Sequence, residues 1–372
     1  MMVRRYADSD PKSTVVIGAP QTGPLFPGIS FRPAKPARLT LPGPNRAYAA
    51  GVHRKLRTVS PELIEVYNRP EIALLLARRC PQTPVSLFLQ NDPQHMRRAE
   101  SARERTALLQ KLGGVITASA YLRERFLDGI PGGQPVHVLP NCLDPAELPP
   151  LRPPEDRERL ILFAGRIVAE KGPDSFLAAC AQVLPRLPGW RAEMIGANRF
   201  GDNSPESPLL KRLRPEAEAA GVVLAGYRPH QGVLEAMARA AIVVVPSRWP
   251  EPFGLVAVEA MACGAALITS RRGALPEIAG DTALYADPED PAALGAAITS
   301  LAQNEDRRIA LAAAGRVRAR RFSLPEMMEQ LRAIRSDILS RWSAPGAGPI
   351  YPEQQSANVS EALCQNIRHR CQ

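Results

Sequence analysis

The chain has 372 residues, 45% of them hydrophobic, which suits two domains of roughly 150 to 180 residues, each with its own core. Its apolar runs stay far below the roughly 20 residues that cross a bilayer, which excludes a membrane span. The first residues turn polar at once, so we expect no signal peptide and a cytoplasmic location, with peripheral contact at the inner membrane face left open.

The formal net charge of +10 is uneven. Residues 1–150 carry 20 Lys and Arg against 12 Asp and Glu, and the remainder carries 27 against 25. A basic first half favours an anionic partner, although a general enrichment in Arg explains the excess equally well. We predict no nucleic-acid partner, because the arginines are scattered and few aromatic residues lie between them.

The six cysteines form no CxxC pair, so we interpret them as reduced thiols, most of them buried. Cys364 and Cys371 flank His369, a spacing that could suggest a metal site. We prefer the simpler interpretation of a polar tail that contains two cysteines, and we expect no metal.

In the first half, short apolar runs alternate with helical patterns, which is typical of a parallel sheet. Strands are expected at 13–20, 63–67, 84–92, 113–119 and 135–141, and helices from about residue 70, at 101–112 and at 121–129. A proline-rich, charged linker follows from Pro145.

A second alternating series begins after the linker. Strands are expected at 159–166, 190–197, 222–228, 241–247 and 265–271, and helices at 172–187, 207–221, 230–240, 253–264, 291–303 and 306–322. We therefore predict an α/β fold of two Rossmann-like, doubly wound domains that face a cleft, at 1–150 and 151–335. A polar tail, 336–372, either crosses back to the first domain or stays unstructured.

The stretch "FAGRIVAEKG" ends a strand at Gly165 and then places Arg166 and Lys171 close together. Ligands bind at the carboxyl ends of parallel strands, and two cations there suit a phosphate or a diphosphate. Two ordinary surface cations on a loop are the alternative.

The stretch "WPEPFGLVAVEAMACG" places Glu251 before a helix and Glu259 among apolar neighbours, where a carboxylate needs a partner. The helix begins near Gly254, and its free N–H groups attract anions, while two acids beside them can accept hydrogen bonds from hydroxyl groups. This combination favours a nucleotide sugar. The alternatives are helix capping for Glu251 and a buried ion pair for Glu259. A third stretch, "SRRGALPEIAG", resembles a loop at a strand end over the same cleft, with Glu277 on the following helix. An ordinary βα turn is the alternative.

Together with "VVVPS" and "ALITS", these stretches resemble the retaining glycosyltransferases of family 4, which have the GT-B arrangement. The resemblance runs from Leu160 to about Phe322. More loosely, "EVYNRPEIALLLARR", "LQNDPQHMR" and "VLPNCLD" resemble the acceptor domain of bacterial enzymes that build cell-surface polysaccharide or lipopolysaccharide.

The resemblance implies a role for each matching residue. It also implies that no cofactor is needed and that no metal is needed, because the side chains of Arg166 and Lys171 would supply the positive charge. Arg166 and Lys171, with Gly165, would hold the donor diphosphate. Glu251 would contact the sugar, and Glu259 would bind the ribose hydroxyls. Support for the sugar and the phosphates would come from the backbone of Phe253, Gly254 and Leu255, and the base would lie near Tyr227 and Arg228. In the first domain, Gln90 stands where the family often has a histidine, and His95 is the nearby residue that could compensate.

The implied function is transfer of a sugar from a UDP-, GDP- or ADP-linked donor to a glycan or a lipid-linked acceptor, with retention of configuration. Compared with the family, we expect the first domain to lack its first βα unit, about thirty residues. One alternative is therefore a weak or inactive nucleotide-sugar-binding paralogue. Another is an epimerase or a phosphorolytic enzyme on the same fold, although no motif for a pyridoxal phosphate lysine is present.

Overall fold

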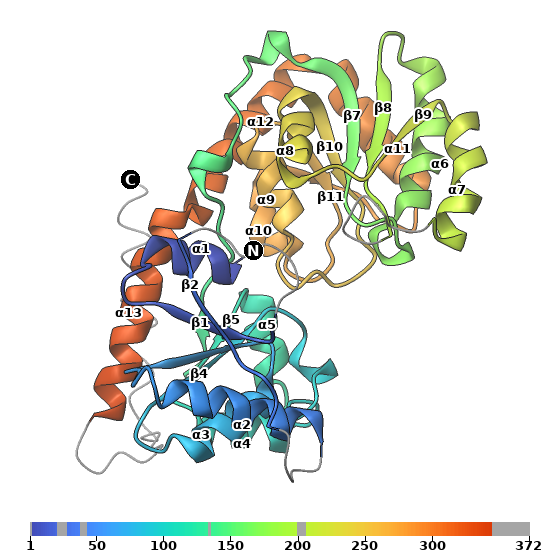
Figure 1. Cartoon of the computed structure of the whole chain (residues 1–372). Helices are drawn as coiled ribbons and strands as arrows, with labels where there is room; N and C mark the ends of the chain where they lie inside the picture. The colour runs from blue at the N-terminus through green and yellow to red at the C-terminus, as the bar shows by residue number, and fades with distance from the viewer. Residues whose placement is uncertain (1, 21–27, 38–42, 133–134, 199–205, 344–372) are drawn as a thin grey trace. The chain divides into compact units, whose positions relative to one another are not determined.

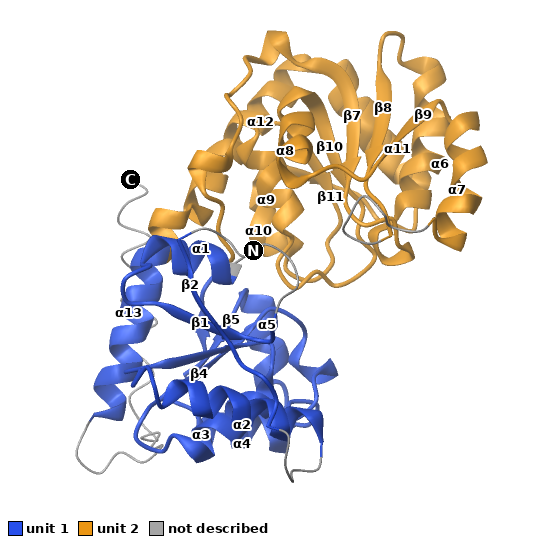
Figure 2. Cartoon of the chain, in the orientation of Figure 1, with its two compact units in different colours: residues 1–140, 328–372 blue, residues 141–327 orange. Residues whose placement is uncertain are grey.

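The computed structural model describes residues 2–20, 28–37, 43–132, 135–198 and 206–343 (Figure 1). It divides the chain into two compact units (Figure 2). Unit 1 comprises residues 1–140 with 328–372, and unit 2 comprises residues 141–327. The sequence placed the corresponding boundaries at 150 and 335.

Unit 1 contains two parallel sheets. Strands β1 (Val15–Gly18) and β2 (Ser30–Pro33) pair with each other, and four further strands pair in the order β3-β4-β5-β6. Among the described residues, these two sheets are not hydrogen-bonded to each other. The absence of a βα unit relative to the family stays a prediction. The other strands are β3 (Ile64–Tyr67), β4 (Val85–Leu89), β5 (Gly114–Thr117) and β6 (His137–Val138), and the helices are α1 (Met2–Ser9), α2 (Pro44–Leu56), α3 (Pro70–Arg79), α4 (Ala102–Lys111) and α5 (Ala120–Leu127).

Local sequence signals explain most of these elements. Helix α3 begins at Pro70 as expected, because proline suits the first helical position. Ser101 and Glu104 form a capping box at the start of α4, and Ser119 caps α5 through the backbone N–H of Leu122. Helices α1 and α2 and strand β2 were not predicted, and β6 is shorter than the expected strand at 135–141.

Helix α13 (Leu324–Trp342) begins in unit 2 and continues into unit 1. Within unit 1, Arg335 donates hydrogen bonds to both carboxylate oxygens of Glu65 on β3, at 2.8 Å each. This two-pronged pair ties the helix to the four-stranded sheet. The polar tail was expected from residue 336, but residues 336–342 are helical. Cys364, His369 and Cys371 lie outside the described residues.

Unit 2 contains a six-stranded parallel sheet in the order β12-β11-β10-β7-β8-β9. Every residue of β10 is buried, as expected for a parallel strand that is covered on both faces. The strands are β7 (Glu158–Ala164), β8 (Arg191–Ile195), β9 (Val222–Gly226), β10 (Ala240–Val245), β11 (Ala266–Thr269) and β12 (Ala283–Tyr285). The helices are α6 (Pro173–Val183), α7 (Pro208–Ala219), α8 (His230–Arg239), α9 (Leu255–Ala262), α10 (Leu275–Ala279), α11 (Pro291–Gln303) and α12 (Glu305–Ala319).

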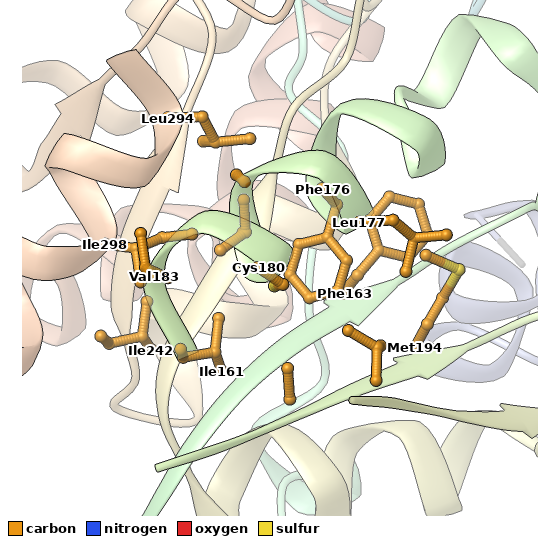
Figure 3. Close-up of a cluster of buried hydrophobic side chains, with 14 of the residues drawn as sticks. Ile161, Phe163, Phe176, Leu177, Cys180, Val183, Met194, Ile242, Leu294 and Ile298 are labelled. Carbon is orange, nitrogen blue, oxygen red and sulfur yellow. The ribbon is translucent and has the colours of Figure 1, made fainter. Parts of the chain in front are cut away.

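The core of unit 2 lies between this sheet and helices α6, α7 and α11 (Figure 3). Phe163 of β7 contacts Phe176 of α6, with ring centroids 5.6 Å apart. Ile161 and Phe163 belong to this cluster, whereas Leu160 and Leu162 are buried outside it, as alternation along a strand requires. The sheet is therefore covered on both faces, which confirms the predicted α/β class. None of the helices in the described ranges has the length and apolar character that crossing a membrane requires.

Candidate functional site

The candidate residues of unit 2 lie in loops at the carboxyl ends of its central strands. Strands β7, β10 and β11 are neighbours in the sheet, so the loops that follow them share one edge. Backbone hydrogen bonds join two of these loops, since the N–H groups of Arg248 and Trp249 donate to the carbonyl of Glu170 at 2.9 and 3.1 Å. We call this region the carboxyl edge, and it is the position at which open parallel sheets bind ligands.

Glu251 is held at the carboxyl edge by groups from three loops. Its side chain is an ion-pair partner of Lys171, and Ser247 Oγ donates to Glu251 Oε1 at 2.7 Å. From the third loop, the N–H of Ala274 donates to the backbone carbonyl of Glu251 at 2.8 Å. Glu251 is only 7% exposed, and a buried carboxylate needs such partners. The structure thus brings together Glu251 and Lys171, which are 80 positions apart.

The loop after β11 approaches the backbone of Glu251 closely. A Cβ atom on Gly273 would lie 2.3 Å from the backbone nitrogen of Glu251, so only glycine fits there. Ser270, at the start of this loop, donates through Oγ to the carbonyl of Ser247 at 2.6 Å. Glu277 lies on α10, as predicted. The stretch "SRRGALPEIAG" therefore supports the position of Glu251 as well as forming a βα turn.

Arg166 follows β7 and is exposed. Among the described residues, it takes part in none of the ion pairs or side-chain hydrogen bonds, in contrast with Lys171. An arginine that is free of internal partners and lies at the end of a central strand can bind an external anion.

Glu259 has a partner that the sequence did not reveal. Its Oε1 lies 2.7 Å from Nε2 of His230, the first residue of α8, and Glu259 is 4% exposed. The buried ion pair was the structural alternative for Glu259, and this contact gives that alternative a specific form when His230 is protonated. The sequence offered one signal for this partner, because His230 begins a predicted helix shortly after a predicted strand.

Helix α9 begins after Gly254, whose φ of 95° favours glycine. Leu255 is the first helical residue, so the free N–H groups of the first turn follow Gly254 as expected. The ring of Phe253 packs edge-on against Phe322 with centroids 5.6 Å apart, and Phe253 is 3% exposed. The Phe253 side chain thus belongs to the core, and only its backbone is available for a ligand.

Three adjacent strands end in glycine at this edge. Gly165 follows β7, Gly196 follows β8, and Gly226 ends β9. A Cβ atom on Gly196 would lie 1.8 Å from the carbonyl oxygen of Gly165, so these two backbones can meet because Gly196 carries no side chain. The sequence prediction did not single out Gly196, although "MIGA" repeats the pattern of "FAGR".

The remaining candidates lie elsewhere. Tyr227, half-buried, and Arg228, exposed, lie in the loop between β9 and α8 of unit 2. Gln90 and His95 belong to unit 1, after β4. The backbone N–H of Gln90 donates to Asn68 Oδ1 at 2.7 Å, while the side chain of His95 is 68% exposed and its Nδ1 lies 3.6 Å from Asp92.

Within the described ranges, no cluster of three or more His, Cys, Asp or Glu residues could hold a metal ion.

Known proteins resemble both the second half and the whole fold. Residues 148–318 match the family described as glycosyl transferases group 1. The chain is 26% identical over 269 residues to the putative glycosyltransferase YtcC of Bacillus subtilis, covering 66% of each chain. It is 32% identical over 191 residues to the D-inositol 3-phosphate glycosyltransferase of Corynebacterium jeikeium, covering 49% of this chain and 44% of that relative. The chain thus spans between about half and two thirds of these relatives.

Among solved structures, Anabaena HepE in complex with UDP matches 90% of this chain and 95% of its own, with 19% identity and a TM-score of 0.73. At this identity the match concerns the fold, which is the α/β fold with parallel sheets of the GT-B glycosyltransferases. Within unit 2, residues 148–318 are thus similar to the domain of the glycosyl transferases group 1 family.

Proposed function

We propose that the protein is a glycosyltransferase that moves a sugar from a nucleotide-sugar donor to an acceptor with retention of anomeric configuration. The observation that carries this proposal is the carboxyl edge of unit 2. There, a buried carboxylate paired with Lys171, the exposed Arg166 and the start of α9 adjoin three strands that end in glycine. The group 1 match covers the same residues.

Each part of the carboxyl edge suits one part of a nucleotide sugar. Arg166, Lys171 and the first turn of α9 supply positive charge for a diphosphate. Glu251 is oriented to accept hydrogen bonds from sugar hydroxyls. The glycine strand ends leave backbone accessible to a flat group such as a base. The cations stabilise the leaving diphosphate, so the chemistry is mainly positioning and electrostatic stabilisation, and we propose that no metal is required.

We further propose that unit 1 binds the acceptor, a glycan or a lipid-linked glycan of the cell envelope. A cavity of about 230 Å³ in unit 1 supports this assignment. It is lined by the start of α2, the first turn of α3 and the segment that follows β4, and three arginines lie around Glu71, which accepts a hydrogen bond from Asn45 at 2.7 Å. The lining arginines are Arg46, Arg97 and Arg98. The basic character of residues 1–150 and the proposed acceptor agree with a protein that works in the cytoplasm at the inner face of the membrane.

The first test is donor binding by the full chain, measured as thermal stabilisation with UDP-, GDP- and ADP-linked sugars. We expect one base to stabilise the chain and Lys171→Ala to lose that effect. Arg212→Ala is the matched control, because the side chain of Arg212 is 62% exposed on α7, where it lies 3.9 Å from Glu216. No stabilisation with any donor would contradict the proposal.

The second test follows the fate of the donor with and without glycan or lipid-linked acceptors. Transfer to an acceptor, with the anomeric configuration of the product read by NMR spectroscopy, would support a retaining glycosyltransferase. Conversion of the donor sugar without an acceptor would identify an epimerase instead. Donor binding without any turnover would identify a binding paralogue.

A further inference from the structure

Unit 2 contains a cavity of about 400 Å³ at the edge of its sheet that is opposite to the carboxyl edge. Its walls come from the residues just before and at the start of β7, Ala241 at the start of β10, Gly264 before β11, and α12. These segments all lie at the amino ends of the strands, so we call the region the amino edge. Because β7 has seven residues at about 3.3 Å each, roughly 20 Å of strand separates this cavity from the carboxyl edge.

The amino-edge cavity is strongly basic. Five arginines line it against two glutamates, and its apolar walls come from one leucine, one isoleucine and several alanines. The charged residues are Arg152, Arg157, Arg159, Arg308, Arg316, Glu155 and Glu305, and the apolar ones include Leu151, Ile309, Ala312 and Ala313. A volume of this size suits a small organic ligand.

Two of the five arginines have structural partners. Arg157 donates to the backbone carbonyls of Ala240, at 2.9 Å, and of Cys263, and so satisfies carbonyls at the ends of α8 and α9. Arg308 donates to the carbonyl of Leu301 at 2.8 Å and lies 3.5 Å from Glu305. These contacts explain why Arg157 and Arg308 are partly buried.

The other three arginines have no such role. Arg152 and Arg159 are exposed at the mouth of the cavity. Nε of Arg316 is buried, yet it has no hydrogen-bond partner among the described residues. A buried donor without a partner carries a desolvation cost that an anion in the cavity would remove. Burial, together with a smaller contribution from the neighbouring Arg152 and Arg316, lowers the pKa of Arg157 to about 10.

We propose that the amino-edge cavity binds a phosphate group carried by a small organic molecule or by a lipid, with Arg152, Arg159 and Arg316 as its ligands. Guanidinium groups hold phosphate oxygens through paired hydrogen bonds, and several converging arginines favour phosphate over a carboxylate. The apolar wall formed by Leu151 and Ile309 then contacts the organic part. The site is separate from the donor site, since it uses the opposite ends of the same strands.

The test measures binding of pyrophosphate to the full chain by calorimetry, in four variants. The Arg152→Gln/Arg316→Gln variant removes two of the three proposed ligands, and Arg152→Gln/Arg159→Gln changes exposed positions alone in case Arg316 contributes to folding. Lys171→Ala removes a cation of the carboxyl edge, and Arg212→Gln is the surface control. We expect a binding event that Lys171→Ala and Arg212→Gln retain and that both cavity variants weaken about tenfold, as charge-assisted hydrogen bonds imply.

A sedimentation experiment separates the two sources of the phosphate. If the wild-type chain sediments with phosphatidylglycerol vesicles but not with phosphatidylcholine vesicles, and the cavity variants do not, the ligand is a lipid headgroup. If pyrophosphate binds and the chain does not sediment, the ligand is a soluble phosphate ester. Pyrophosphate binding that is equal in wild type and in both cavity variants overturns the proposal, and so does its absence in Lys171→Ala. These results do not depend on sugar transfer, so the two proposals fail separately.

Discussion

The two edges of the sheet in unit 2 both carry charged groups, but these groups are arranged differently. At the carboxyl edge, acids and bases occur in close pairs, Lys171 with Glu251 and His230 with Glu259. At the amino edge, five arginines face only two glutamates. The chain connectivity explains part of this difference, because helices begin at the carboxyl edge with free N–H groups and end at the amino edge with free carbonyls.

This comparison shows that a charged cluster can serve the fold, a ligand or both. Arg157 serves the fold, since helix-end carbonyls accept its hydrogen bonds. Lys171 pairs with the buried carboxylate of Glu251, and the proposed function assigns it a second role at the donor diphosphate. Substitutions at matched positions of the two edges can separate these roles.

The largest effect is expected from Lys171→Ala at the carboxyl edge. It leaves Glu251 buried without its cation and removes positive charge from the proposed diphosphate site. We expect sugar transfer to fall about 100-fold or more, as for the loss of a single electrostatic contact to a transition state. Steady-state transfer rates measure this change.

A double-mutant cycle with Glu251→Gln sharpens that prediction. Because the two side chains form one ion pair, the double variant should lose much less than the sum of the two single losses. Additive losses would show that Lys171 and Glu251 act on the substrate independently.

Gly196→Ala should cost the fold itself at least about 3 kcal/mol, because its Cβ would lie 1.8 Å from the carbonyl oxygen of Gly165. Chemical denaturation measures the free energy of unfolding. Gly232→Ala, within α8 and with its nearest neighbour at 3.7 Å, is the matched control, and it should stabilise the protein slightly. If both substitutions change the free energy of unfolding equally, the backbone segments of Gly165 and Gly196 can move apart at little cost.

At the amino edge, Arg157→Met should lower the free energy of unfolding by about 2 kcal/mol, since it leaves buried helix-end carbonyls without donors. Arg152→Gln, on the same cavity but exposed, should change it by less than about 0.5 kcal/mol. Thermal and chemical denaturation of the two variants distinguish the structural arginine from the proposed ligand. A large loss for Arg152→Gln would assign both residues to the fold.

The smallest effect is expected from Glu259→Gln, which keeps the shape of the side chain but removes its charge. We expect donor affinity to fall by about 1 to 2 kcal/mol, the scale of hydrogen bonds to a charged group. The parallel variant His230→Gln tests the pair from the other side. If both variants reduce stability and neither changes donor affinity, the pair of Glu259 and His230 belongs to the fold alone.

Local patterns in the sequence were sufficient for the α/β class, for almost every strand and helix of unit 2, and for the placement of Lys171 and Glu251 at strand ends. Those inferences depend on periodicity, capping and proline or glycine signals, which act within a few residues. The same signals missed α1, α2 and β2, where the segments are short or weakly amphipathic.

Only the tertiary structure decided which distant residues meet. The contact of His230 with Glu259, the approach of Gly196 to Gly165 and the arginine cavity at the amino edge all depend on the strand order β12-β11-β10-β7-β8-β9. That order arises from packing of the whole sheet and its helices, a sum of many nonlocal contacts that no short stretch of sequence encodes.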